Sequence, residues 1–175
     1  RSMVGGYGQD DRVCAYTALQ AILDTKAVKR TAVCVLVDKE EIGSMGNTGM
    51  RSAFFEYATA TLVEKLSGTY HELMLKRVFR NSACLSSDVS AAVDPSYSDV
   101  NEKMNAAFVG HGIVMNKYTG SRGKSGTSDA NAEFVFAVRK LFHDNQILWQ
   151  SAELGKVDAG GGGTIAQYVA NLDVQ

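Results

Sequence analysis

Residues 31–37, with the sequence Thr-Ala-Val-Cys-Val-Leu-Val, form a continuous apolar run that is rich in β-branched side chains. Such a run is typical of a strand covered on both faces, as in the parallel or mixed sheets of α/β proteins. The run ends at Asp38, so charged residues follow directly after the predicted strand. The sequence therefore predicts a buried strand over 31–37 with polar side chains at its carboxyl end.

Helical patterns and shorter strand patterns flank this run. In residues 11–25 the apolar side chains recur at helical spacing, and Ser128 or Asp129 is a suitable N-cap for a helix over 129–144. The remaining predicted elements are helices at 49–66, 70–80 and 163–172 and strands at 83–89, 113–118 and 147–153. This order of elements predicts an α/β fold in which a mixed β-sheet is sandwiched by helices.

The composition narrows the class of protein. The 175 residues are 45% hydrophobic and 21% charged, with a net charge of -1, which fits one globular domain and lacks the basic surface that nucleic-acid binding requires. No apolar run approaches the roughly 18 to 20 residues of a membrane span. Three widely spaced cysteines, Cys14, Cys34 and Cys84, do not form a disulfide framework. We therefore expect a cytoplasmic protein without nucleic-acid or membrane partners.

Three sets of carboxylates lie where predicted elements begin or end. Asp10 and Asp11 precede the first helix, Glu40 and Glu41 follow the apolar run, and Asp88 lies near the end of the second strand. In α/β sheets the carboxyl ends of strands commonly carry the functional site, and one of two adjacent acids is able to bind a cation while the other reaches a water. However, an aspartate before a helix is often only an N-cap, and paired glutamates after a strand are often solvated. No histidine has ligand-like spacing, so the patterns alone leave both interpretations open.

Four motifs occur in order along the chain, namely DDRVCAY at 10–16, DKEEIGS at 38–44, SDVSAAVDPSY at 87–97 and DAGGGGTI at 158–165. Together they resemble the aspartyl aminopeptidase / aminopeptidase I family of zinc metallopeptidases. The stretch KYTGSRGK at 117–124 is similar to the bacterial branch of that family. The resemblance implies a zinc-exopeptidase-like catalytic domain and an enzyme that releases N-terminal amino acids from peptides.

The resemblance also implies roles for individual residues. It implies two zinc ions, with cobalt or manganese as substitutes, that share Asp10 as a bridging ligand. Glu41 would bind one zinc and Asp88 the other, Glu40 would be the general base, and Lys117 would contact the substrate. Two cations lower the pKa of a shared water, so Glu40 would take its proton during attack and pass it to the departing amine.

The glycine-rich segments have a role of their own in this interpretation. The loops at 120–126 and 160–163 would let the backbone approach a bound peptide closely. Together with the segment around Lys117, the turn that begins at Asp158 favours the aminopeptidase over two alternatives. These alternatives are a non-catalytic binding or assembly module on the same scaffold and a related metal-dependent deacylase.

The chain departs from the family pattern in two ways. Many members have histidines where this sequence has Ala91 and Asp94, so specificity for acidic N-termini does not follow. The family's His-x-Asp segment, its inserted oligomerisation domain and its last histidine ligand do not occur within residues 1–175. We therefore expect these residues to form the central part of a catalytic domain, with homo-oligomers in the full-length protein. Because zinc held by carboxylates alone is bound weakly, we expect little peptidase activity from this chain.

Overall fold

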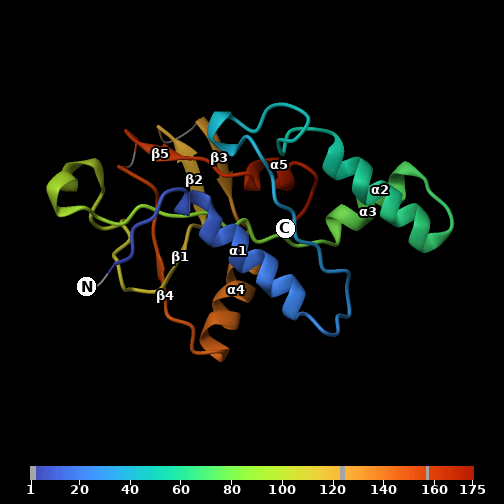
Figure 1. The fold of residues 1–175 in the computed structure, drawn as a ribbon, viewed down its shortest axis with the longest axis horizontal. Helices are drawn as coiled ribbons and strands as arrows, with labels where there is room; N and C mark the ends of the chain where they lie inside the picture. Colours follow the sequence, from blue (N-terminus) through green and yellow to red (C-terminus); the bar gives the residue numbers. More distant parts are fainter. Residues whose placement is uncertain (1–2, 123–124, 157) are drawn as a thin grey trace.

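The computed structural model describes residues 3–122, 125–156 and 158–175, and it has the α/β class that the sequence predicts (Figure 1). The α-helices are α1 (Gln9–Asp24), α2 (Phe54–Ser67), α3 (Glu72–Arg80), α4 (Ala132–Asp144) and α5 (Ala166–Ala170). Two 3-10 helices are η1 (Glu40–Ile42) and η2 (Pro95–Val100). The strands are β1 (Ile113–Met115), β2 (Tyr118–Ser121), β3 (Ser125–Asp129), β4 (Trp149–Ser151) and β5 (Gly161–Gly162).

The strands pair in two small sheets that together contain parallel and antiparallel neighbours. β1 pairs in parallel with β4, from Ile113 opposite Trp149 to Met115 opposite Ser151. In the other sheet β2 lies between β3 and β5 and is antiparallel to both. α4 lies on the connection from β1 to β4, as parallel pairing requires. The ring of Phe142 on α4 lies 5.9 Å from the ring of Trp149, so this helix packs on β4.

The predicted strand over 31–37 is wrong as an assignment of secondary structure. The segment is extended, but within the described part of the chain none of its backbone groups bonds to another strand. Its side chains are mostly exposed, and Val33 retains 60% of its accessible surface. A β-branched run favours extended backbone, but a strand forms only where a neighbouring strand supplies hydrogen-bond partners.

The predicted strand over 83–89 is likewise not formed. The segment is extended, and among the described residues its backbone–backbone hydrogen bonding is limited to the bond from Cys84 N to Gln175 O, at 2.7 Å. The neighbouring Ser82 O accepts a bond from Gln175 N. The predicted strands at 113–118 and 147–153 are confirmed as β1 and β4, in shorter form. The hairpin of β2 and β3 was not predicted; part of its turn, at 123–124, lies outside the described residues.

All five predicted helices are confirmed, although several boundaries move. In α1 the backbone of Asp10 and Asp11 is not helical, so the regular helix begins at Arg12. α2 and α3 pack as a hairpin at one end of the molecule, where the rings of Phe55 and Phe79 stack at 5.6 Å (Figure 1). α2 begins later than predicted because residues 49–53 form turns.

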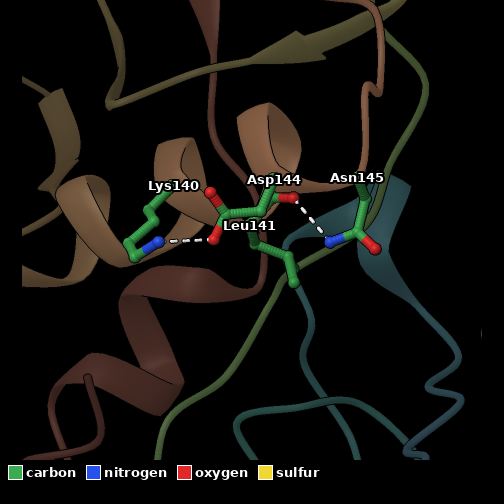
Figure 2. A network of polar contacts seen from close by, with 4 residues as sticks. All are labelled: Lys140, Leu141, Asp144 and Asn145. Carbon is green, nitrogen blue, oxygen red and sulfur yellow. Dashed lines mark hydrogen bonds and ion pairs between the residues drawn. The ribbon is translucent and has the colours of Figure 1, made fainter.

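The ends of α4 are fixed by polar side chains. The predicted N-caps Ser128 and Asp129 are wrong, because both residues belong to β3, and Asn131 caps the helix instead. At the other end the Lys140 ammonium pairs with Asp144, and Asn145 Nδ2 donates to the Leu141 carbonyl at 2.9 Å (Figure 2). The Asn131 and Asn145 side chains thus bond to backbone groups at the two helix ends, whereas the Lys140–Asp144 pair joins two side chains.

Replacing Asn131 with alanine is expected to lower the free energy of unfolding by about 1 kcal/mol. The Asn131 Oδ1 atom accepts a hydrogen bond from the backbone N–H of Phe134 at 2.8 Å, and alanine leaves that N–H unpaired. Urea unfolding followed by circular dichroism measures the change. Asn131→Asp, which keeps the acceptor, is the matched control and is expected to remain close to the wild type.

The core is small for a chain of this size. The buried apolar residues include Phe79 at 2% exposure, and the others are Met50, Leu75, Ala106, Ala107, Val138, Ala152 and Val169. The accessible surface is 12798 Å², whereas a compact protein of this mass exposes about 8,300 Å². α1 contains no buried residue, and Leu23 is 67% exposed. The apolar stripe of α1 and the segment 31–37 therefore form an open surface. Within the ranges described, no helix has the length and apolar character needed to span a bilayer.

Candidate metal centre

Three aspartates from two separate segments meet at the start of α1. Ligand atoms of Asp10, Asp11 and Asp88 all lie within 4.8 Å of one another. The first two precede the regular part of α1, and Asp88 lies near the end of the extended segment 83–89. The non-helical backbone of Asp10 and Asp11 lets two adjacent carboxylates face one partner, which regular helical spacing would not allow. The predicted convergence of Asp10 with Asp88 is therefore present.

The chemistry of this group fits a cation. Burial raises the pKa of the Asp88 carboxyl, and the charges of Asp11 and Asp10 raise it further, while the backbone N–H of Val89, at 2.7 Å, partly offsets them. The Asp11 Oδ1 atom is buried and has no hydrogen-bond partner within the described residues. Like charges held this close together repel one another, and a buried oxygen without a partner is costly. A divalent cation would offset both costs, since carboxylate oxygens are suitable ligands for zinc.

Glu40 lies beside these aspartates. Burial raises the pKa of its carboxyl, and the charges of Asp88, Glu41, Asp10 and Asp11 contribute in that order. Hydrogen bonds of the loop that follows the run 31–37 hold η1 in place. In that loop Asp38 N donates to Thr48 O at 3.2 Å, and Thr48 Oγ1 donates to Asp38 Oδ2 at 3.1 Å. Glu40 is thus a carboxyl with a raised pKa, which suits a group that accepts and returns a proton.

Two other predicted site residues do not lie in the aspartate group. Glu41 is exposed in η1 and does not belong to the three-carboxylate group found among the described residues. Its role as a ligand stays a prediction. The Lys117 ammonium pairs with Asp129 Oδ1 at 2.5 Å across the β2–β3 hairpin. A contact between Lys117 and a substrate also stays a prediction, and it would compete with this ion pair.

The two glycine-rich segments lie side by side. Gly120 pairs with Gly162 and Ser121 with Gly161, and a Cβ at Gly161 would come within 2.1 Å of the Gly120 carbonyl oxygen. A hydrogen bond of 3.5 Å between Ser86 and Thr164 connects this pair to the segment that carries Asp88. The glycines border a hollow of about 310 Å³ that is lined by Tyr118, Thr119, Gly120, Glu153, Leu154, Lys156, Asp158, Gly160 and Gly162. Residues 123–124 of the predicted loop 120–126 lie outside the described residues.

The sequence interpretation missed two residues at this centre. Asp11 was named with Asp10 among the candidate carboxylates but was assigned no role of its own, yet its carboxylate belongs to the aspartate group. Cys14, in the first regular turn of α1, was considered only as one of three cysteines outside a disulfide framework, yet its partly buried thiol lies near the charges of Asp11 and Asp88. Burial and the Asp11 carboxylate raise the pKa of this thiol to about 11.

Comparison with known proteins identifies the family. The model of the aminopeptidase I zinc metalloproteases (M18) matches residues 1–175. The chain belongs to this family. A probable M18 family aminopeptidase 1 of Clostridium acetobutylicum is 57% identical over 175 residues, which are 100% of this chain and 37% of that protein. The family is one of peptide-hydrolysing enzymes, so the predicted resemblance and the enzyme class are confirmed.

Solved structures agree with this assignment. The crystal structure of an M18 aminopeptidase from Thermotoga maritima superposes with a TM-score of 0.91 at 46% identity, over 97% of this chain and 38% of that chain. A yeast structure described as the mApe1 dodecamer has a TM-score of 0.58 at 20% identity, over 98% of this chain and 47% of that chain, and shows likeness of fold alone. The chain thus spans less than two fifths of the bacterial relatives that it matches.

Proposed function

We propose that this chain carries the metal-binding carboxylates and the general base of a metalloaminopeptidase that uses two zinc ions. Asp10 would bridge the two ions, Asp88 would bind one of them, and Glu41 would bind the other. The observation that carries the proposal is the convergence of Asp10, Asp11 and Asp88 to within 4.8 Å in a chain that belongs to a zinc metalloprotease family. The buried, unpartnered Asp11 oxygen supports it, because that atom gains a favourable interaction only when a cation or donor is close.

In the proposed mechanism Glu40 moves the proton. When bound, the zinc ions polarise the peptide carbonyl and make a water more acidic. Glu40 accepts the proton of the attacking water and then donates it to the nitrogen of the departing amine. The raised pKa of its carboxyl supports the first step, because a stronger conjugate base accepts a proton more readily.

The substrate would be the N-terminal end of a peptide. The hollow beside the paired glycine segments provides about 310 Å³ next to the backbone of β2 and β5. Its position beside the segment of Asp88, through the contact of Ser86 with Thr164, supports this assignment. Lys117 would contact the substrate after release from Asp129.

Metal titration of the chain tests the proposal. After removal of metal with EDTA, isothermal titration with Co²⁺ or Zn²⁺ is expected to show binding that Asp10→Asn weakens strongly. Glu40→Gln is the matched control: it changes a neighbouring carboxyl that is assigned to proton transfer and is expected to leave the affinity within about threefold. A wild-type chain that binds neither metal, or an Asp10→Asn variant that binds as well as the wild type, would contradict the metal centre.

The chain is expected to hydrolyse aminoacyl chromogenic substrates at most slowly, even with added zinc or cobalt. The three-carboxylate group contains no histidine among the described residues, and carboxylates alone hold zinc weakly. Release of the chromophore, followed by absorbance, measures turnover. Rapid turnover that depends on Glu40 would show that the residues present suffice for catalysis.

The assembly and the compartment of the protein are further parts of the proposal. We propose a homo-oligomer in the full-length protein, supported by the similarity of fold to the yeast dodecamer. We also propose a cytoplasmic location, supported by three cysteines that are all unpaired.

A further inference from the structure

An ion pair joins the two strands at the open end of the β2–β3 hairpin. The Lys117 Nζ atom donates to Asp129 Oδ1 at 2.5 Å. Lys117 directly precedes β2, and Asp129 is the last residue of β3, opposite Tyr118. The backbone N–H of Ala130 donates to the Lys117 carbonyl at 2.9 Å. Main-chain contacts therefore hold the two charged residues next to each other.

This ion pair borders the hollow that is proposed to hold the substrate. Tyr118 and Thr119, the two residues that follow Lys117, line the hollow. Among the described residues, the charged groups of its lining are two carboxylates and one ammonium group, from Glu153, Asp158 and Lys156. The ammonium group of Lys117 adds no net positive charge beside them, because the Asp129 carboxylate neutralises it.

The pair affects charge more than stability. Its side chains are 45% and 59% exposed, and exposed ion pairs contribute little to the free energy of unfolding. The backbone pairing of β2 with β3 already holds the hairpin together. An acidic group that approaches Lys117 meets an ammonium whose charge is balanced and a carboxylate that repels the newcomer. The pair therefore makes this side of the hollow unfavourable for a second carboxylate.

We propose that Asp129 is a positioning residue that sets the specificity of the substrate hollow: it holds the Lys117 ammonium and so disfavours peptides whose first residue is acidic. The inference rests on the proposed function, in which the hollow holds the N-terminal end of a peptide and Lys117 contacts it. Specificity of this kind comes from a repulsive group rather than from an added contact. Peptides with a neutral or basic first residue are accepted, because their side chains do not compete with Asp129 for Lys117.

Equilibrium binding in EDTA is the test, because it needs neither metal nor turnover. Isothermal titration of the full-length protein compares aspartyl-alanine amide with asparaginyl-alanine amide, which have nearly the same shape and differ by one charge. The wild type is expected to bind the asparaginyl peptide at least as tightly as the aspartyl peptide. Asp129→Asn, which leaves Lys117 without its carboxylate, is expected to shift the ratio of the two Kd values about tenfold in favour of the aspartyl peptide.

Three further variants separate this effect from a change in the fold. Adding Lys117→Met to Asp129→Asn removes the released ammonium and is expected to return the ratio to its wild-type value. Asp129→Glu keeps the charge and is expected to keep the ratio within about threefold. Asp144→Asn is the matched control, because Asp144 pairs with Lys140 on α4 and does not line the hollow. It is expected to leave the ratio unchanged.

An unchanged ratio in Asp129→Asn would overturn the proposal, as would a wild type that prefers the aspartyl peptide. Absence of binding by every variant would also overturn it, because the hollow would then hold no peptide end. Hydrolysis of the same peptides with added zinc tests the proposed function separately. A protein that binds with the expected selectivity but hydrolyses neither peptide would contradict the proposed enzyme while supporting the role of Asp129.

Discussion

Replacing Asp88 with asparagine is expected to weaken Co²⁺ binding by at least about 100-fold while stabilising the metal-free chain by a few tenths of a kcal/mol. The amide removes one of three negative charges that lie within 4.8 Å, so the repulsion in the metal-free state decreases. Its oxygen is still able to accept the bond from Val89 N. Isothermal titration measures the affinity, and urea unfolding in EDTA measures the stability.

The pH dependence of this stability has a definite sign. The pKa values of Asp88 and Glu40 are raised in the folded state, so the folded chain binds more protons than the unfolded chain above the ordinary pKa of 3.8 of an aspartate. These carboxyls therefore favour folding at low pH. Their contribution to stability is lost as the pH rises through their raised pKa values in the folded state. In Asp88→Asn the free energy of unfolding is expected to fall less steeply as the pH rises.

Asp99→Asn is the matched control for these measurements, because Asp99 is exposed in η2 and does not belong to the aspartate group. It is expected to change neither the affinity nor the slope of stability against pH. Asp88→Asn is expected to weaken metal binding but to stabilise the metal-free chain, and this combination distinguishes a ligand from a residue that supports the fold. A variant that lost both metal affinity and metal-free stability would indicate that Asp88 mainly supports the fold.

Gly112→Ala is expected to lower the free energy of unfolding by roughly 3 to 5 kcal/mol. Gly112 directly precedes β1 and has a φ of +87°, and an added Cβ would lie 2.1 Å from the Leu148 carbonyl oxygen. That oxygen accepts the bond from Ile113 N at 3.0 Å, which begins the pairing of β1 with β4. The methyl group would therefore displace β4 from β1. Urea unfolding followed by the fluorescence of Trp149, in β4, measures the loss.

Gly110→Ala separates the steric effect from the backbone effect. Gly110 has a similar φ of +82°, but no atom lies within 4 Å of an added Cβ. Its replacement is expected to cost only about 1 to 2 kcal/mol, the cost of a left-handed conformation for a residue with a side chain. Equal losses for the two variants would mean that the close approach of Gly112 to Leu148 does not limit stability.

Helices were predictable from the sequence, and most strands were not. The apolar spacing in α1, α3 and α4 is local information, and each helix satisfies its own backbone. The extended segments 31–37 and 83–89 depend on partners elsewhere in the chain, and sequence pattern does not say whether a partner is there. The hairpin of β2 and β3 was missed for another reason: its serines, glycines and threonines show no apolar alternation.

The sequence predicted which residues belong to the site better than it predicted how those residues are arranged. Motif order selected Asp10, Glu40 and Asp88, and the structure brings these three close enough for their charges to interact. The motif order did not select Asp11, because an acid before a helix is commonly an N-cap. The direction in which Asp11 points depends on the non-helical backbone at the start of α1, which no propensity encodes.

The open segment 31–37 also determines how the chain behaves in concentrated solution. It is extended, free of charge and proline, rich in valine, and its backbone groups do not bond to any other strand in the described part of the chain. Such segments are templates for cross-β aggregation between molecules. A lysine in place of the exposed Val33 would act as a gatekeeper, since each added strand would have to bring another charge into the stack. The valines of this segment are therefore expected to be the part of this chain most prone to self-association.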